Sequence, residues 1–308
     1  MTNLLASPAL PTPYQHSVDF KLLEPKLEAL VAEATAPTLS AEAMRQSFNA
    51  SLEEAASVLR SVPIHEGRLL ERGIDLLAAC NPDLVVLTEN IRLAVTPAAM
   101  QLVEHNEAHL YRGLTLDADT GGRKSYTPDH LIINRLTGVA HMVDVKRSLT
   151  SYEASRIAGL KNRMLASAVV APDHVYKEHR RLTIKEVRVV ILNAQAGGRT
   201  DIKGGIWPLS HLDHLLEVTG AGEVLLTLRK MFRERIDANW AAARGPTAAS
   251  DMDGSTSVTG LDGSAEDVGD MDSVAAQWTD AGEGNAAVPD DRPPVIVGFA
   301  QVPAAGPH

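Results

Sequence analysis

The sequence predicts a mixed α/β protein with a helical N-terminal region and a polar, acidic C-terminal tail. Three observations support this fold class. Apolar residues recur at spacings of three and four between residues 20 and 80, the period of amphipathic helices. Short apolar strands alternate with helical segments between residues 97 and 194. After residue 244 the chain becomes rich in Gly, Ser, Thr and Asp, a composition too polar to build a core.

Four regions follow along the chain. We expect a flexible N-terminus at 1–19 and a helical region at 20–95, in which 81–95 fits either a helix or a strand. A mixed α/β domain with C-terminal helices follows at 96–244, and a disordered acidic tail with a short apolar end segment at 245–308. Thr96 and Pro97 mark the start of the third region as an N-cap and a proline in the first helical turn.

The third region is expected to contain elements in the order α-β-β-β-α-β. After the helix that starts at Pro97, the apolar runs and the turns between them predict strands at 111–116, 130–135 and 139–147, a helix at 151–170, and a strand at 184–194. Two more helices precede residue 245.

Composition limits the class of protein. The chain has 308 residues, of which 44% are hydrophobic, enough for one sizeable core. Its single cysteine, Cys80, excludes an intrachain disulfide and a cysteine-rich zinc site, and indicates a reducing compartment. No secretion signal or run of about 18 apolar residues is present, so we expect a soluble, cytoplasmic protein with no membrane partner.

Charge is distributed unevenly along the chain. Residues 245–308 hold eleven acids and one base, which accounts for the whole net charge of −10. Residues 123–188 instead carry thirteen Lys and Arg against six acids. A basic stretch of this kind suits a polyanion, although a solvated helix face gives the same count.

The most informative stretch is YTPDHLIINRLTGVAHMVDVKRS, residues 126–148, which reads as a strand hairpin. Residues two apart in a strand share a face, so Asp144 and Lys146 point one way and Val145 the other. The short turn should pair the strands and bring Asp129 close to Asp144. Two carboxylates beside an ammonium group favour a divalent cation such as Mg²⁺.

Pro128-Asp129, followed after fourteen residues by Asp144-Val145-Lys146, resembles the PD-(D/E)XK nuclease superfamily. The αβββαβ order resembles the restriction-endonuclease-like core of that family, and the local text is most similar to TnsA-type transposon-end endonucleases. The resemblance covers residues 97–195. It implies a metal-dependent DNA endonuclease, using Mg²⁺ or Mn²⁺, of a mobile element, plasmid or phage. The alternative is a catalytically inactive nuclease-fold protein that binds DNA or acts as an adaptor in a nucleoprotein complex.

The resemblance also implies roles for individual residues. Asp129 and Asp144 would bind the metal together with the Val145 carbonyl, and Lys146 would position the attacking water. The family often adds a glutamate from the helix before the first strand. Glu107 lies beside the apolar stripe of that helix, whereas Glu104 lies further toward solvent, so we choose Glu107 as the additional ligand and catalytic residue.

The expected partner is DNA. Basic groups placed to contact backbone phosphates are Arg123, Lys124, Arg147, Arg156, Lys161 and Arg163. The apolar end segment PPVIVGFAQV, residues 293–302, is a peptide ligand for a protein partner, an added sheet edge, or disordered. A homodimer is compatible with the sequence.

Other motifs are weaker. Asp173 with Asp201-Ile202-Lys203 is a rival match to the nuclease motif, but its glycine-bracketed DIK segment reads as a loop. His105 and His109 lack the glutamate that follows the first histidine in zinc proteases. HLDH, residues 211–214, is interpreted as a solvated helix face, and His130 should point away from Asp129. No Gln-x-x-x-Tyr follows Lys146, which argues against a RecB-like exonuclease.

Overall fold

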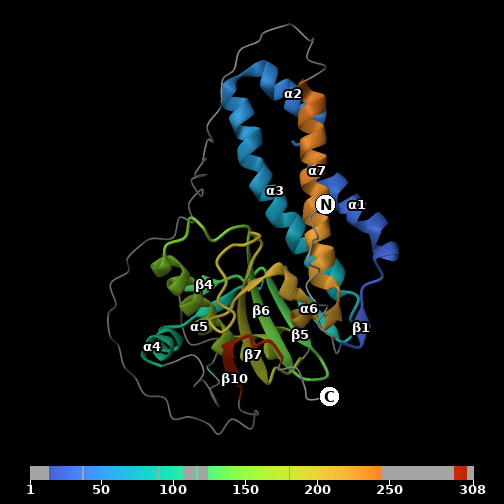
Figure 1. Cartoon of the computed structure of the whole chain (residues 1–308). Coiled ribbons are helices and arrows are strands. Elements are labelled where there is room, and N and C mark those ends of the chain that lie inside the picture. The colour runs from blue at the N-terminus through green and yellow to red at the C-terminus, as the bar shows by residue number, and fades with distance from the viewer. Residues whose placement is uncertain are drawn as a thin grey trace.

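The computed structural model of the protein describes residues 14–36, 38–88, 91–106, 116, 124–179, 181–244 and 295–303. The fold is mixed α/β, as predicted. Long helices stand against one end of a mixed sheet and extend beyond it (Figure 1). The helices are α1 (Phe20–Thr35), α2 (Ala41–Ala50), α3 (Leu52–Ala78), α4 (Pro97–His105), α5 (Ala154–Glu178), η2 (Leu209–His211), α6 (Leu212–Leu216) and α7 (Ala221–Arg244).

The main sheet has the strand order β10-β7-β6-β5-β2, and β8 also pairs with β7. Strand β5 pairs antiparallel with β2 and with β6, while β7 pairs in parallel with β6, β8 and β10. Two small sheets join β1 to β9 and β3 to β4. The strands are β1 (His16–Ser17), β2 (Leu84–Leu87), β3 (Leu93–Val95), β4 (Lys124–Tyr126), β5 (His130–Asn134), β6 (Val139–Lys146), β7 (Glu186–Asn193), β8 (Ile206–Pro208), β9 (Val218–Thr219) and β10 (Ile296–Phe299).

Capping residues explain where several helices begin. The Ser40 hydroxyl accepts a hydrogen bond from the Ala43 amide at 3.2 Å, and the Thr96 hydroxyl accepts one from the Ala99 amide at 3.1 Å. Each bond satisfies an amide that has no partner within its own helix. The expected helix start at Thr96, with Pro97 in the first turn of α4, is therefore confirmed, and Ser40 begins α2 in the same way.

The alternation of side chains along the strands divides the interior into two cores. Val143 and Val145 of β6 face α3 and α7, whereas Met142 faces α5. Asp144 lies between the two valines in sequence and therefore points to the α5 side of the sheet. The hairpin was predicted to have this alternation.

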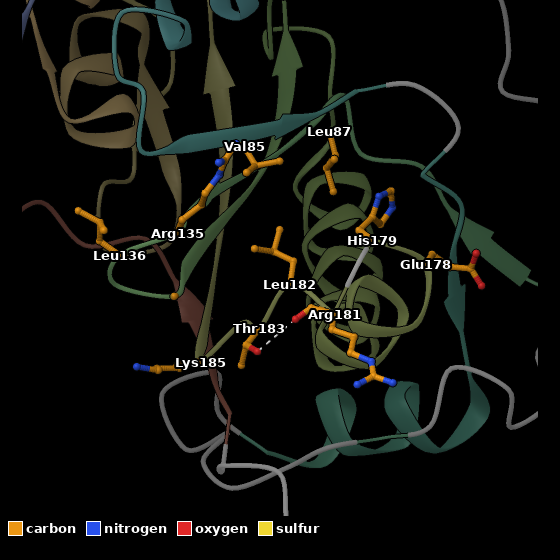
Figure 2. A pocket seen from close by; sticks show the side chains of 11 residues that line it. Val85, Leu87, Arg135, Leu136, Glu178, His179, Arg181, Leu182, Thr183 and Lys185 are labelled. Atoms are coloured by element: carbon orange, nitrogen blue, oxygen red, sulfur yellow. Dashed lines mark hydrogen bonds between the residues drawn. The ribbon is translucent and has the colours of Figure 1, made fainter.

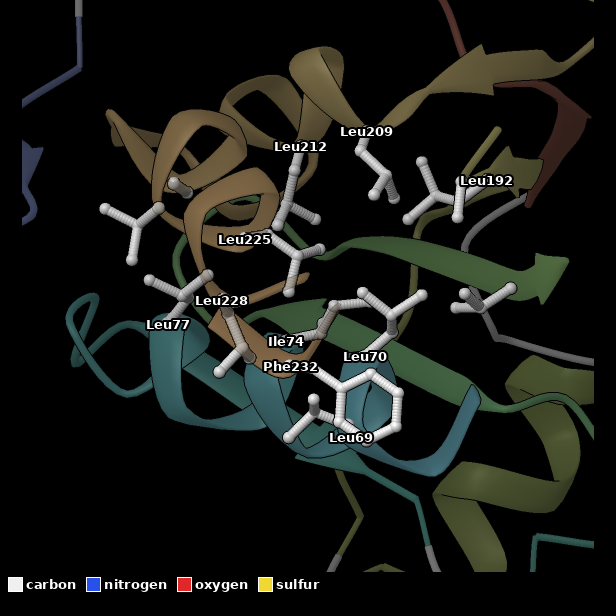
Figure 3. Close-up of a cluster of buried hydrophobic side chains, with 14 of the residues drawn as sticks. Leu69, Leu70, Ile74, Leu77, Leu192, Leu209, Leu212, Leu225, Leu228 and Phe232 are labelled. Atoms are coloured by element: carbon white, nitrogen blue, oxygen red, sulfur yellow. The ribbon is translucent and has the colours of Figure 1, made fainter. Parts of the chain in front are cut away.

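Helices α3 and α7 pack closely over the first core. Leu70 and Ile74 of α3 meet Leu225 and Leu228 of α7 (Figure 3). A Cβ atom at Gly73 would lie 2.6 Å from the Leu228 Cδ2 atom, which is too close without movement of that side chain. The glycine therefore permits the close approach of the two helices.

A buried ion pair fixes these helices to the end of the sheet. The Arg229 Nε atom of α7 donates to the Glu66 Oε1 atom of α3 at 2.6 Å, and both side chains are 7% exposed. Arg229 also donates through Nη1 to the Ala194 carbonyl, just after β7. The Ala194 amide in turn donates to the Lys146 carbonyl at 2.8 Å. Hydrogen bonds thus run from α3 through α7 to the end of β6.

The first strand of the sheet is not the expected one. Residues 111–115 of the predicted strand lie outside the described residues, and Leu116 has no regular structure. Strand β2, from the segment that fitted either a helix or a strand, pairs with β5 instead. The order α-β-β-β-α-β is traced by α3, β2, β5, β6, α5 and β7 only when β3, α4 and β4, which lie between β2 and β5 in the chain, are treated as an insertion. Four apolar residues are too few for periodicity to identify this strand.

The expected boundary at residue 95 does not separate two packing units. Strand β2 lies in the main sheet, and α7 packs with α1, α2 and α3. The helices expected between residues 20 and 80 are present. No helix in the described parts of the chain has the length and apolar character required to cross a bilayer.

The apolar C-terminal segment forms a sheet edge. Strand β10 pairs in parallel with β7, and Val295, Val297 and Ala300 are buried. Of the three expectations for this segment, the added edge is therefore correct. These three side chains face the chain's own core, whereas Ile296 is 43% exposed, so binding of a protein partner by this segment stays a prediction. The acidic residues 245–294 and residues 304–308 lie outside the described part of the structure.

Candidate active site

The hairpin of β5 and β6 brings Asp129 and Asp144 together. His130 pairs with Val143 across the two strands, so the same register continued by one residue places Asp129 opposite Asp144. The Asp129 Oδ2 atom accepts a hydrogen bond from the Val145 amide at 2.6 Å. The Asp129 carboxylate therefore reaches across to the strand that carries Asp144 and Lys146.

Asp144 is buried, with an exposed fraction of 4%. The Tyr126 hydroxyl donates to its Oδ2 atom at 2.6 Å. Its buried Oδ1 atom lies 2.5 Å from the Lys146 Nζ atom and forms an ion pair with it. The Lys146 side chain is 27% exposed, so its amine also reaches the surface.

Electrostatics at this end of the sheet are strongly perturbed. Burial, and after it the charge of Asp144, raises the pKa of Asp129 to about 7. Burial lowers the pKa of Lys146, but the charges of Asp144 and Asp129 outweigh it, and the pKa lies above its ordinary value. Burial and the Asp144 carboxylate raise the pKa of Tyr126. The cluster holds more negative charge than one ammonium group balances, which favours a bound cation.

Helix α3 adds a third carboxylate, from Glu71. Its charge is among those that raise the pKa of Asp129. Burial raises the pKa of Glu71 itself, while the charges of His130 and Lys146 oppose that rise. Its half-buried side chain thus lies within electrostatic reach of both strands of the hairpin.

The glutamate chosen on α4 stays a prediction, and α3 offers a second candidate. Glu107 lies outside the described residues, and Glu104 is exposed on α4. Because β2 is the first strand of the sheet, the preceding helix is α3 and not α4. Glu71 was missed, although it meets the criterion used for Glu107: it stands beside an apolar stripe, next to the buried Leu70.

His130 fixes α3 on the opposite side of the sheet, as its predicted direction requires. Its ring is fully buried, and its Nε2 atom lies 3.1 Å from the Glu71 carbonyl and 3.2 Å from the Asp75 Oδ1 atom. The imidazole therefore holds the helix turn that carries Glu71. Asp129 and His130 are adjacent in the chain, so their side chains point to opposite faces of the sheet, Asp129 toward the carboxylate cluster and His130 under α3.

The predicted phosphate contacts differ in how they are placed. Arg123 lies outside the described residues, while Lys124, Arg147 and Arg163 are exposed. The charge of Arg163 acts on Tyr126, so this arginine lies near the Asp144 end of the sheet.

Two further predicted phosphate contacts carry interactions of their own. The Arg156 guanidinium lies 4.7 Å from the centre of the Tyr152 ring. The Lys161 Nζ atom lies 3.5 Å from the Asp201 Oδ2 atom and 5.4 Å from the centre of the Phe299 ring. Lys161 is thus engaged within the protein and is the least suited of the group to bind phosphate.

The residues of the rival nuclease motif, Asp173 and Asp201, do not come together in the structure. Asp173 is buried in α5 and pairs with Lys177 at 2.9 Å, whereas Asp201 lies in an exposed turn and binds the Gly204 amide at 2.9 Å. Asp201 contacts Lys161, which lies twelve residues before Asp173, roughly 18 Å along the helix. The two aspartates therefore do not share a site.

The prediction that HLDH, residues 211–214, forms a solvated helix face is wrong. His211 and His214 are half-buried beside Trp207, and the Tyr14 hydroxyl lies 2.6 Å from the His214 Nδ1 atom. They are therefore part of a packed aromatic cluster and not a solvated face. His105 is exposed, while His109 lies outside the described residues.

A cavity of about 690 Å³ lies at the other end of the sheet, beside β2 and the end of α5. Figure 2 shows Leu182 near Val85 and Leu87, whereas the Arg181 and Lys185 side chains extend away from this apolar floor. None of the three motif residues lines the cavity. It is separate from the carboxylate cluster.

Within the described residues, no group of three or more His, Cys, Asp or Glu side chains is arranged to hold a metal ion. The two adjacent aspartates still fit Mg²⁺, since this ion is commonly held by one or two carboxylates and keeps several waters. The Asp144 Oδ1 atom faces the Lys146 ammonium, a cation that Mg²⁺ would displace. Comparison with protein families, curated proteins and solved structures finds no match to this chain.

Proposed function

We propose that the chain is a metal-dependent DNA endonuclease of the PD-(D/E)XK type, which hydrolyses phosphodiester bonds. The observation that carries the proposal is the meeting of Asp129, Asp144 and Lys146 at one end of β5 and β6. Two adjacent acids in a poorly solvated position destabilise a fold unless a cation binds them. A chain that only bound DNA would have no use for this arrangement.

The order of elements gives independent support. Helix α3, strands β2, β5 and β6, helix α5 and strand β7 follow the α-β-β-β-α-β order that resembles the nuclease core. The motif stands on the two central strands of this order, and Glu71 comes from its first helix. Sequence motif and chain path therefore support the same family.

Asp129 and Asp144 would hold Mg²⁺ or Mn²⁺ together with the Val145 carbonyl. The Val145 amide points to Asp129, and the amide and carbonyl of one strand residue point to the same side. When bound, the metal polarises the phosphodiester and lowers the pKa of a coordinated water. The Val145 amide fixes the orientation of Asp129 before any ion binds.

Lys146 is placed to act on the attacking water and on the charge of the phosphate. Its ammonium remains protonated, because Asp144 and Asp129 hold its pKa above the ordinary value. It therefore serves as a hydrogen-bond donor and a positive charge, not as a general base. Glu71 contributes a further acceptor on the α3 side of the site, directly or through water.

Substrate DNA would lie across the exposed end of β6. Arg147 and Arg163 are exposed near this end, and residues 123–188 carry an excess of basic groups. These cations suit a phosphate backbone, whose contacts with Lys and Arg dominate affinity.

Cleavage of supercoiled plasmid with Mg²⁺ or Mn²⁺ tests the proposal. We expect the wild type to nick or linearise the DNA, and Asp144→Ala or Lys146→Ala to lower the rate at least about a hundredfold. The matched control is Asp201→Ala with Lys203→Ala, which changes the rival triplet in an exposed turn and should retain activity. Cleavage that survives both active-site changes contradicts the proposal. Binding of DNA without cleavage by the wild type supports the inactive alternative.

A further inference from the structure

The two aspartates of the site share one feature: each has one carboxylate oxygen already occupied. Tyr126 donates to the Asp144 Oδ2 atom at 2.6 Å, and the Val145 amide donates to the Asp129 Oδ2 atom at 2.6 Å. Hydrogen bonds to charged acceptors of this length are strong. The other oxygen of Asp144, Oδ1, lies 2.5 Å from the Lys146 Nζ atom, so a metal ligated by this oxygen would displace the ammonium group.

The two hydrogen bonds differ in how they can be changed. The Val145 amide belongs to the backbone and is fixed by the strand. Tyr126 is a side chain, 9% exposed, on strand β4, and its ring packs in the core beneath α5. The packed ring holds the hydroxyl against Asp144, so the bond does not depend on a mobile surface group.

Occupied oxygens matter because divalent cations differ in how they use carboxylates. Ca²⁺ takes about six to eight oxygens in a flexible geometry and often binds both oxygens of one carboxylate. Mg²⁺ and Mn²⁺ are smaller and suit octahedral oxygen sites, in which a carboxylate gives a single oxygen. A site in which a hydrogen bond already engages the Oδ2 atom of each aspartate therefore favours the smaller ions.

We infer that Tyr126 is a positioning residue that sets the metal selectivity of this site by preventing bidentate coordination through Asp144. The inference rests on the proposed function only in that a divalent cation binds Asp129 and Asp144. It assigns Tyr126 no contact with DNA and no part in proton transfer. Removal of its hydroxyl frees the Asp144 Oδ2 atom and relaxes the preference against Ca²⁺.

The test measures binding equilibria on the full chain. The affinity for Mn²⁺ is obtained from the electron paramagnetic resonance signal of the free ion, and the affinity for Ca²⁺ from its competition with Mn²⁺. The proteins are the wild type, Tyr126→Phe, and Tyr176→Phe, whose ring is 37% exposed on α5. Asp144→Asn identifies the site, because the tight Mn²⁺ signal should disappear in this variant.

The expected result is a fall of about tenfold in the ratio of Mn²⁺ to Ca²⁺ affinity for Tyr126→Phe, the effect of one hydrogen bond to a charged group. Tyr176→Phe should keep the wild-type ratio. Partial unfolding lowers both affinities by the same factor and leaves the ratio unchanged, so the readout does not depend on full stability.

A ratio for Tyr126→Phe within about twofold of wild type overturns the inference, given that one lost hydrogen bond should exceed that change. So does Mn²⁺ binding that Asp144→Asn leaves intact. The proposed function fails differently: if Mn²⁺ binds through Asp144 and Tyr126→Phe shifts the ratio, but no DNA is cleaved, the selectivity inference stands and the nuclease proposal does not.

Discussion

The buried pair of Glu66 and Arg229 gives a prediction whose size follows from the structure. Arg229→Met leaves the Glu66 carboxylate and the Ala194 carbonyl without their main donor. Removal of one member of a buried ion pair costs about 3–5 kcal/mol of stability. The Arg233 Nη2 atom lies 3.5 Å from the same Glu66 oxygen and can replace part of the interaction. We therefore expect a loss of about 3 kcal/mol, at the lower end of that range.

The double variant Glu66→Leu with Arg229→Met should recover most of this loss, because no charge then remains buried without a partner. The Ala194 carbonyl still lacks its donor, which costs about 1–2 kcal/mol. Urea unfolding of the wild type, both single variants and the double variant gives the coupling between the two residues. A double variant no more stable than Arg229→Met, or an Arg229→Met loss below about 1 kcal/mol, refutes the reasoning.

Three further predictions concern separate parts of the molecule. Gly205 has a φ of +77°, and a Cβ there would lie 2.6 Å from Phe299, so Gly205→Ala should lower the free energy of unfolding by about 2 kcal/mol and speed hydrogen exchange in β10. Gly197 has a φ of +66° but open space around it, so the control Gly197→Ala should lower that free energy by only about 1 kcal/mol. Equal losses in the two variants would contradict this prediction. Burial, followed by the Arg188 charge, lowers the pKa of His141 to about 3, so stability should fall as the pH drops from about 6.5 toward that value, by up to ~1.4 kcal/mol per unit. His141→Gln should flatten this acid dependence in urea unfolding, whereas the exposed His105→Gln should not. Glu71→Gln should lower metal-dependent plasmid cleavage about 10–100-fold and Glu104→Gln less than about twofold; the reverse order would restore α4 as the source of the glutamate.

The hairpin could be predicted in detail because its pattern is local. The alternation around Asp144 fixes which side chains share a face, and a shift of one residue would turn Val143 and Val145 away from the α3 and α7 core and place Asp144 in it. A short turn leaves few registers, so the meeting of Asp129 and Asp144 followed from the sequence. The helix starts at Ser40 and Thr96 were equally local, since each depends on one hydroxyl and one nearby amide.

The parts that could not be predicted depend on contacts distant in sequence. Strand β2 is four residues long, and its pairing with β5 spans more than forty residues. Without that pairing, nothing identifies α3 as the helix of the site, and Glu71 is one acid among many on a helix. The packing of His211 and His214 against Trp207 and Tyr14 likewise joins distant segments, and a helical period does not reveal it.

Strand β10 has a consequence for how the protein is made. The chain runs from Asn193 at the end of β7 through the helices and the acidic residues before it reaches Ile296. During synthesis, the first half of β7 must therefore wait until β10 has left the ribosome before its neighbour on that side can pair. A chain truncated within residues 245–294 would keep the cluster around Asp144 but would lack β10, and backbone groups along one edge of β7 would be left unpaired. Such an edge can pair with a strand of another copy, so the truncated chain should aggregate more readily than the chain that carries β10.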